Sequence, residues 1–80
     1  MLPNREGEIA ICTTLDGEVE LRAPVGTRVA TGQILAIVEG ECELESLSVR
    51  NPSEVVAHCV ECGSEVTAGT TLMRVREVDD

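Results

Sequence analysis

Short runs of alternating apolar and polar residues, separated by turn-forming residues, dominate the chain. Turn signals such as Asp16-Gly17, Asn51-Pro52 and Gly63-Ser64 separate segments that are rich in β-branched residues. No extended stretch keeps a helical period. The pattern therefore predicts an all-β protein. We expect strands near residues 8–14, 18–22, 34–38, 43–49, 54–60 and 71–76, with two very short ones at 28–30 and 65–67.

One glycine-punctuated pattern occurs twice. Residues 25–38 align without a gap on residues 62–75, and both copies read G-x-x-V-x-x-G-x-x-L-x-x-V. Each copy describes a tight turn, one buried Val, a second turn and a strand, and each copy alone would expose an apolar face. We therefore predict two copies that face each other about a pseudo-two-fold axis and bury both faces.

The composition restricts the kind of core and the kind of site. The chain has 80 residues and contains no Phe, Tyr or Trp, so Val, Leu, Ile, Ala and Met have to fill the core. Such a core suits a thin sandwich, in which the two sheets pack about 10 Å apart. The missing aromatic residues also disfavour a small-molecule pocket and the stacking surfaces that bind single-stranded nucleic acid. We expect one domain over residues 7–77, with tails at 1–6 and 78–80.

The charge narrows the choice of partner. The net charge is −9, and the six basic residues are arginines scattered along the chain. Nucleic acids and anionic membrane surfaces are therefore disfavoured, whereas a protein partner with a basic surface is compatible. The charge is also compatible with a role in solubility alone. No apolar run is long enough to span a membrane, and the N-terminus shows no signal peptide. We expect a cytoplasmic protein with reduced cysteines, whose oligomeric state stays open.

The first copy of the repeat carries a family resemblance. Residues 26–39 read GTRVATGQILAIVE. This segment resembles the biotinyl/lipoyl carrier domain family, whose members read G-D-x-V-x-x-G-Q-x-L-A-x-I-E before a modified lysine at a hairpin tip. The resemblance covers about residues 7–77. It implies a single hybrid motif, that is, a flattened β-sandwich or barrel-sandwich hybrid in which the attachment hairpin joins the two halves at one end.

The tip itself departs from that family. Biotinyl members continue with Ala-Met-Lys-Met and lipoyl members with Asp-Lys-Ala, whereas this chain reads Gly40-Glu41-Cys42-Glu43. The attachment lysine is replaced by Cys42, flanked by Glu41 and Glu43, and the chain contains no lysine anywhere. Arginine is always protonated and is no substitute for the lysine amine. We therefore expect neither biotin nor lipoate, and no other cofactor.

Without the attachment lysine, the function has to be predicted from the other features of the chain. No catalytic Ser/His/Asp motif and no phosphate-binding glycine loop is present, so we expect no enzyme. We therefore predict a protein-interaction or assembly module that is related to biotin carboxyl carrier proteins and docks on its partner through the acidic hairpin. One alternative is a carrier in which the Cys42 thiol holds an acyl group, a persulfide or a mixed disulfide. The surrounding glutamates oppose this alternative because they disfavour the reactive thiolate.

A second alternative is a metal-binding scaffold. The segment Cys59-Val60-Glu61-Cys62-Gly63, preceded by His58, resembles a zinc knuckle, in which two sulfurs bind one metal. A tetrahedral site needs two further ligands, for which His58, Cys12 and Cys42 are candidates. A strand over 54–60 would separate Cys59 and Cys62 by roughly 10 Å. We therefore assign no metal site and expect Cys12 and Cys59 to be small core residues.

Overall fold

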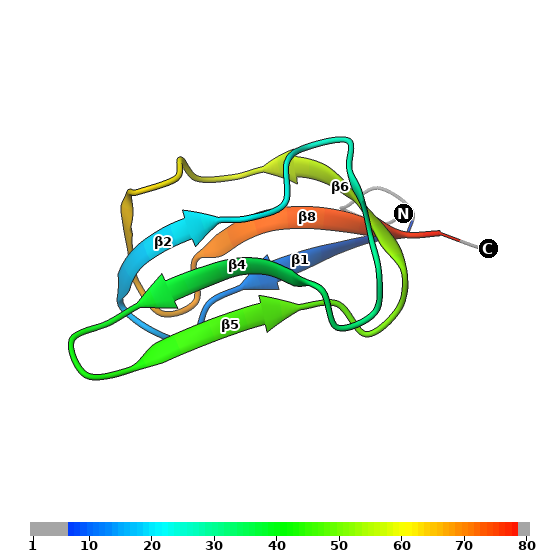
Figure 1. The fold of residues 1–80 in the computed structure, drawn as a ribbon. Helices are drawn as coiled ribbons and strands as arrows, with labels where there is room; N and C mark the ends of the chain where they lie inside the picture. The colour runs from blue at the N-terminus through cyan, green and yellow to red at the C-terminus, as the bar shows by residue number, and fades with distance from the viewer. Residues whose placement is uncertain (1–6, 79–80) are drawn as a thin grey trace.

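The computed structural model describes residues 7–78, which form two four-stranded antiparallel sheets (Figure 1). No predicted strand end is displaced by more than two residues, so the all-β prediction is confirmed. The predicted N-terminal tail at 1–6 and the last two residues of the C-terminal tail lie outside the described part. The strands are β1 (Glu8–Cys12), β2 (Gly17–Leu21), β3 (Arg28–Val29), β4 (Ile34–Glu39), β5 (Leu44–Ser48), β6 (Ser53–His58), β7 (Glu65–Val66) and β8 (Thr71–Glu77).

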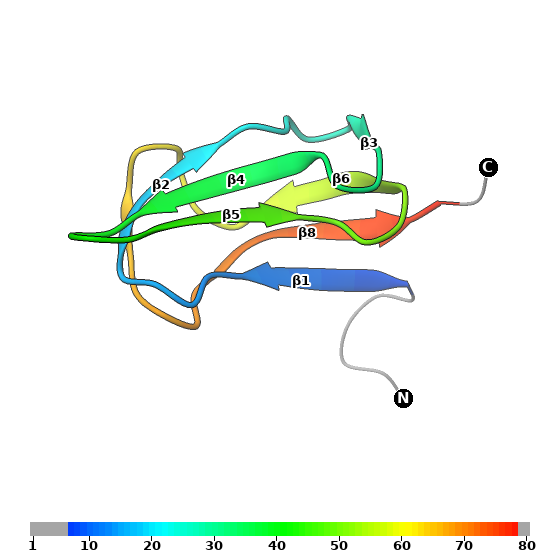
Figure 2. The same cartoon turned by 60° about the horizontal axis from the view of Figure 1, so that its bottom comes forward.

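The two sheets are related by the internal repeat. One sheet has the order β1-β8-β6-β3 and the other β5-β4-β2-β7. Exchanging each strand for the one four places away in the chain converts the first order into the second, and the sheets lie in two layers (Figure 2). The turns repeat as well, because Gly26 and Gly63 have φ values of 90° and 91°. Glycine adopts this left-handed conformation without steric cost. The predicted pseudo-two-fold repeat is therefore confirmed.

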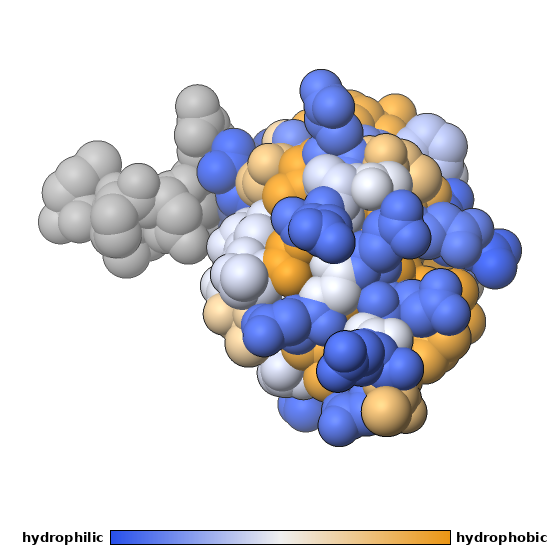
Figure 3. Space-filling model, turned by 90° about the vertical axis from the view of Figure 1, so that its left-hand side faces the viewer, coloured by the Kyte–Doolittle hydropathy of each residue, from blue (hydrophilic) through white to orange (hydrophobic). Residues whose placement is uncertain are grey.

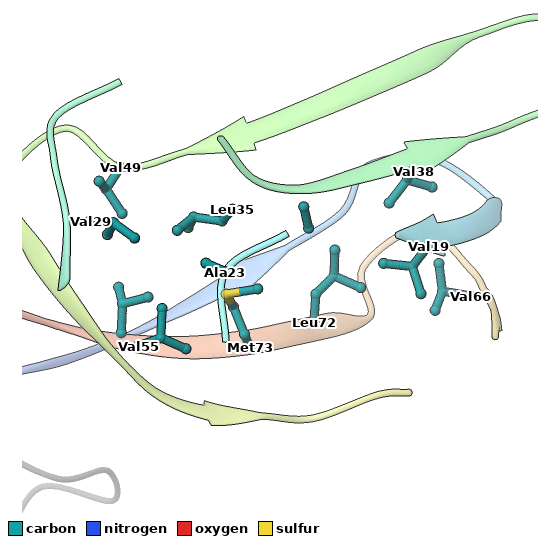
Figure 4. Close-up of a cluster of buried hydrophobic side chains, with 12 residues drawn as sticks. Val19, Ala23, Val29, Leu35, Val38, Val49, Val55, Val66, Leu72 and Met73 are labelled. Atoms are coloured by element: carbon teal, nitrogen blue, oxygen red, sulfur yellow. The ribbon is translucent and has the colours of Figure 1, made fainter. Parts of the chain in front are cut away.

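The core lies between the sheets and is drawn from both copies of the repeat (Figure 4). Its fully covered leucines, Leu35 and Leu72, occupy equivalent positions. Isoleucine contributes less to this core than expected, because Ile11 is only partly buried against it and no isoleucine of the described residues is among the buried core residues. Ile9 and Ile34 are 41% and 42% exposed, because one lies on the edge strand β1 and the other at the start of β4. The buried core residues are Val19, Ala23, Val29, Leu35, Ala36, Val38, Val49, Val55, Val66, Leu72, Met73 and Val75.

The arrangement separates the chain ends from the hairpin that joins the two halves. The start of β1 and the end of β8 lie at one end of the sandwich, and the β4–β5 hairpin projects from the other end (Figure 1). Over residues 7–78, no helix is both long and apolar enough to cross a bilayer.

Candidate functional site at the hairpin tip

Residues 40–43 form the turn of the β4–β5 hairpin. The last paired residues of the ladder are Glu39 and Leu44, and the Gly40 N–H donates a hydrogen bond of 2.7 Å to the Glu43 carbonyl. Glu41, Cys42 and Glu43 are exposed. The structure therefore presents to solvent the position at which the resembling family carries its lysine.

The base of this hairpin is held by a close approach of two backbones. A Cβ atom added at Gly17 would overlap the carbonyl of Glu39, and one added at Gly40 would lie 2.9 Å from the Asp16 carbonyl oxygen. Only glycine leaves room for this contact between the β1–β2 turn and the end of β4. The projecting tip therefore stands on a tightly packed base.

Glu45 fastens the other side of the hairpin to the β1–β2 loop. Its Oε1 accepts hydrogen bonds from the Thr13 hydroxyl (2.7 Å) and the Thr14 N–H (2.9 Å). Its Oε2 accepts a hydrogen bond of 2.7 Å from the Thr14 hydroxyl. The Thr14 N–H is the main reason why the pKa of Glu45 lies below its ordinary value, with partial burial opposing the shift and the two hydroxyls adding to it. The charged carboxylate is thus the form that the folded state favours.

We expect Glu45→Gln to lower the stability at neutral pH by about 1 kcal/mol, since hydrogen bonds to a charged group at a partly exposed site are lost. A depressed folded pKa gives stability that is complete above the unfolded pKa, roughly 4.3, and is lost as pH falls through the folded value. The difference between wild type and variant should therefore shrink as the pH is lowered from neutral to below 4. Urea denaturation at several pH values measures it, and a difference that stays constant with pH would contradict this role of the carboxylate.

Acidic side chains surround the base of the tip. Asp16, Glu18, Glu39, Glu41 and Glu65 line one open hollow of 710 Å³. This end of the molecule is mostly hydrophilic, with apolar patches between the polar side chains (Figure 3). Among the described residues, no group of three or more His, Cys, Asp or Glu side chains is arranged to hold a metal ion. The arrangement is therefore an extended negative surface rather than a converging ligand set.

The residues of the zinc-knuckle alternative, His58, Cys59 and Cys62, lie elsewhere, at and after the end of β6. The strand ends at His58, whose Nε2 is 2.7 Å from the Ala23 carbonyl oxygen. The Cys59 N–H donates to the Leu72 carbonyl (2.9 Å), and the Cys62 Sγ accepts from the Leu21 N–H (3.3 Å). The expected strand over 54–60 is thus two residues too long, so the spacing argument drawn from it does not apply.

The cysteine side chains are not part of the core. All four cysteines are free and exposed, so the prediction that Cys12 and Cys59 are small core residues is wrong. Cys12 ends the edge strand β1, and its Sγ lies 3.4 Å from the Thr71 hydroxyl oxygen. Cys59 follows the last residue of β6, where the chain leaves the sheet. Cys12 is thus the last residue of a strand and Cys59 directly follows one, and both side chains are exposed.

Sequence reasoning missed the residues that support the tip, above all Gly17 and Glu45. Asp16-Gly17 gave a turn signal, but nothing in it indicated the contact with Glu39. No local signal singles out Glu45, because its partners Thr13 and Thr14 lie about thirty residues earlier in the chain.

Comparison with known proteins gives structural relatives only. No family model and no curated protein matches the chain. A single-chain, multi-domain long-chain acyl-CoA carboxylase matches with a TM-score of 0.84 and 25% identity, over 99% of this chain and 8% of the carboxylase. A putative succinylglutamate desuccinylase/aspartoacylase from Shewanella frigidimarina NCIMB 400 matches with a TM-score of 0.75 and 19% identity, over 90% and 20% of the two chains. The chain thus corresponds to a small part of each.

The fold prediction is confirmed by the strand order together with the carboxylase match. The protein is an all-β, flattened barrel-sandwich hybrid of the biotinyl/lipoyl type with an internal pseudo-two-fold repeat. The desuccinylase match supports the fold alone.

Proposed function

We propose that this chain is a non-catalytic domain related to biotin carboxyl carrier domains, and that it acts in the cytoplasm as a protein-interaction or assembly module. One observation carries the proposal. The exposed turn at residues 40–43 keeps the form of an attachment hairpin but presents Glu41, Cys42 and Glu43 in a chain without lysine.

The partner is a protein with a basic docking surface. The tip stands on a firmly packed base and is flanked by the acidic hollow, so it presents negative charge in a defined place. Complementary charge of this kind mainly sets specificity and the rate of association. The likeness to part of an acyl-CoA carboxylase supports a partner of the carboxylase type.

Charge reversal at the tip tests the proposal. We expect Glu41→Arg combined with Glu43→Arg to remove the partner that the wild type retains in affinity purification from its native host, because the docking contact becomes repulsive. Quantitative mass spectrometry of the retained proteins measures the loss. Both side chains are exposed, so the variant should remain folded.

The matched control is Glu61→Arg combined with Glu77→Arg, which makes the same change in net charge at exposed positions outside the tip. This control should retain the partner. Equal retention by the tip variant and the wild type would refute docking through the tip.

The alternative of a carrier that uses the Cys42 thiol stays a prediction. It is supported by the exposure of Cys42 at the turn and opposed by the two adjoining glutamates. The metal-binding alternative has only two sulfurs, Cys59 and Cys62, and the neighbouring His58 in its support.

A further inference from the structure

A line of like charges crosses the outer face of one sheet. Glu18 on β2 lies directly opposite Glu39 on β4 and directly opposite Glu65 on β7. Residues opposite each other in antiparallel strands project from the same face. We call Glu39, Glu18 and Glu65 the acidic row. All three side chains are exposed, and Leu44 on β5 extends the line beyond Glu39.

The other sheet carries the equivalent line with its charges compensated. There Glu8 on β1 lies opposite Arg76 on β8, Arg76 lies opposite Glu54 on β6, and Glu54 lies opposite Arg28 on β3. The signs alternate along this paired row. Glu8 also forms an ion pair with Arg76, in which the Arg76 Nη2 and the Glu8 Oε2 are 3.6 Å apart.

Because the internal repeat relates the two sheets, each position of the acidic row has an equivalent position in the paired row. By strand order and register, Glu39 corresponds to Arg76, Glu65 to Arg28 and Glu18 to Glu54. The same fold position therefore accepts either sign. The carboxylates of the acidic row are not required by the packing of this sandwich.

The acidic row has no internal compensation. Among residues 7–78, no arginine lies within ion-pair distance of Glu39, Glu18 or Glu65, and the nearby Arg22 pairs with Glu20 at 3.1 Å. Like charges directly opposite each other destabilise a sheet. The row thus carries an electrostatic cost that a cation from outside would remove.

Apolar side chains accompany the row. Leu44 is 62% exposed, and Ile37 is half-buried beside Glu39. Their equivalents in the other sheet are the charged residues Glu8 and Arg74. Ile37 and Leu44 line a hollow of 350 Å³ together with two residues of the acidic row. The lining residues are Glu18, Val19, Glu20, Ile37, Glu39, Leu44, Cys62 and Gly63. Apolar walls with an acidic rim suit the aliphatic stem and charged head of an arginine or lysine.

We propose that this sheet face, formed by the acidic row with Ile37 and Leu44, binds an extended segment of a partner protein that carries several closely spaced arginines or lysines. The inference rests on the proposed interaction function and names the chemistry of the partner and a second contact besides the tip. A single metal ion is a poor occupant, because no described ligands converge. A second copy is also a poor occupant, because the arginines Arg28 and Arg76 already alternate with carboxylates on their own sheet.

The probe for the test is a fluorescent eight-residue peptide with arginine at alternate positions and valine or threonine between them. Fluorescence anisotropy measures its binding to the intact chain at low and at physiological ionic strength. We expect salt-sensitive binding that Glu18→Gln weakens about threefold to fivefold, the effect of removing one exposed charge partner. We expect Glu18→Arg, which makes the signs along the row alternate, to weaken peptide binding more than Glu18→Gln does. We expect the same of Leu44→Ser.

The matched control is Glu54→Gln, which makes the same change in net charge in the paired row and should leave the affinity within a factor of about two of the wild type. Equal weakening by Glu18→Gln and Glu54→Gln would show attraction by net charge alone and overturn the proposal, as would absence of binding at low salt. A wild type that dimerises in sedimentation, while Glu18→Arg does not, would assign the face to a second copy and also overturn it.

Docking through the tip and binding by the acidic row can be refuted independently of each other. If the variant Glu41→Arg with Glu43→Arg retains the cellular partner and Glu18→Arg loses both peptide and partner, docking through the tip is wrong and the acidic row stands. If only the tip variant loses the partner and Glu18→Arg binds the peptide like the wild type, the acidic row is wrong and the proposed function stands.

Discussion

A biotin protein ligase will leave the natural chain unlabelled and will biotinylate the variant in which Glu41→Met, Cys42→Lys and Glu43→Met are combined. The variant restores the Met-Lys-Met sequence of the biotinyl family at an exposed turn whose base is unchanged. The new amine at position 42 attacks the biotinyl adenylate that the ligase makes from biotin and ATP, which forms the amide and releases AMP. Gly40 is retained, although the family has alanine there, because an added Cβ would lie 2.9 Å from the Asp16 carbonyl oxygen. Intact mass before and after the ligase reaction measures the gain of one biotinyl group.

The control places a lysine on the same hairpin but outside the turn, as Ser46→Lys on the exposed face of β5. This variant should remain unlabelled, because the position and the flanking residues are both wrong. A folded triple variant that the ligase does not label would show that the likeness to carrier domains stops at the fold and does not extend to presentation of the tip.

Replacing Gly17 by alanine will cost roughly 3 kcal/mol of stability, the upper part of the range for overpacking, because the added methyl group meets backbone rather than a movable side chain. The obstacle is the carbonyl of Glu39, the last residue before the tip. The substitution therefore also displaces the base of the hairpin. Urea denaturation measures the change in free energy, and partner capture should weaken with it.

A second glycine provides the comparison. A Cβ atom added at Gly69 meets no atom within 4 Å, so Gly69→Ala suffers only from the left-handed backbone at φ 93°. Its cost should be about 1–2 kcal/mol. If Gly17→Ala is the milder of the two, the close approach of Gly17 to Glu39 does not constrain the hairpin as the structure indicates.

Much of the fold followed from local signals in the chain. In β2 the apolar alternation correctly indicated that Val19 faces inward, whereas in β1 it did not, since Ile9 is exposed and Glu8 is buried. Glycines such as Gly26 and Gly63 marked turns that need positive φ. Because those signals recur at a constant spacing, the repeat and its pseudo-symmetry could be predicted without coordinates. The position of Cys42 in the connecting turn followed from the resemblance to the biotinyl/lipoyl family, not from the repeat.

The fate of the cysteines could not be predicted in this way. Cys12 and Cys59 are small and weakly polar, so composition favoured burial. Both are exposed in the structure, one at the end of β1 and the other directly after β6. Such strand ends are set by pairing with β8, a segment distant in sequence.

The charge pattern shows most clearly which features the sequence determined and which ones the tertiary structure decided. The sequence by itself determined that the chain is acidic, that it lacks lysine and that Glu18, Glu39 and Glu65 lie in strands or at their ends. Only the tertiary structure decided that these three carboxylates lie in one line, whereas Glu8, Arg76, Glu54 and Arg28 alternate in sign. The physical reason is that alternation along a strand fixes the face on which a side chain lies, while its neighbours across the sheet depend on strand order and register, which long-range pairing sets.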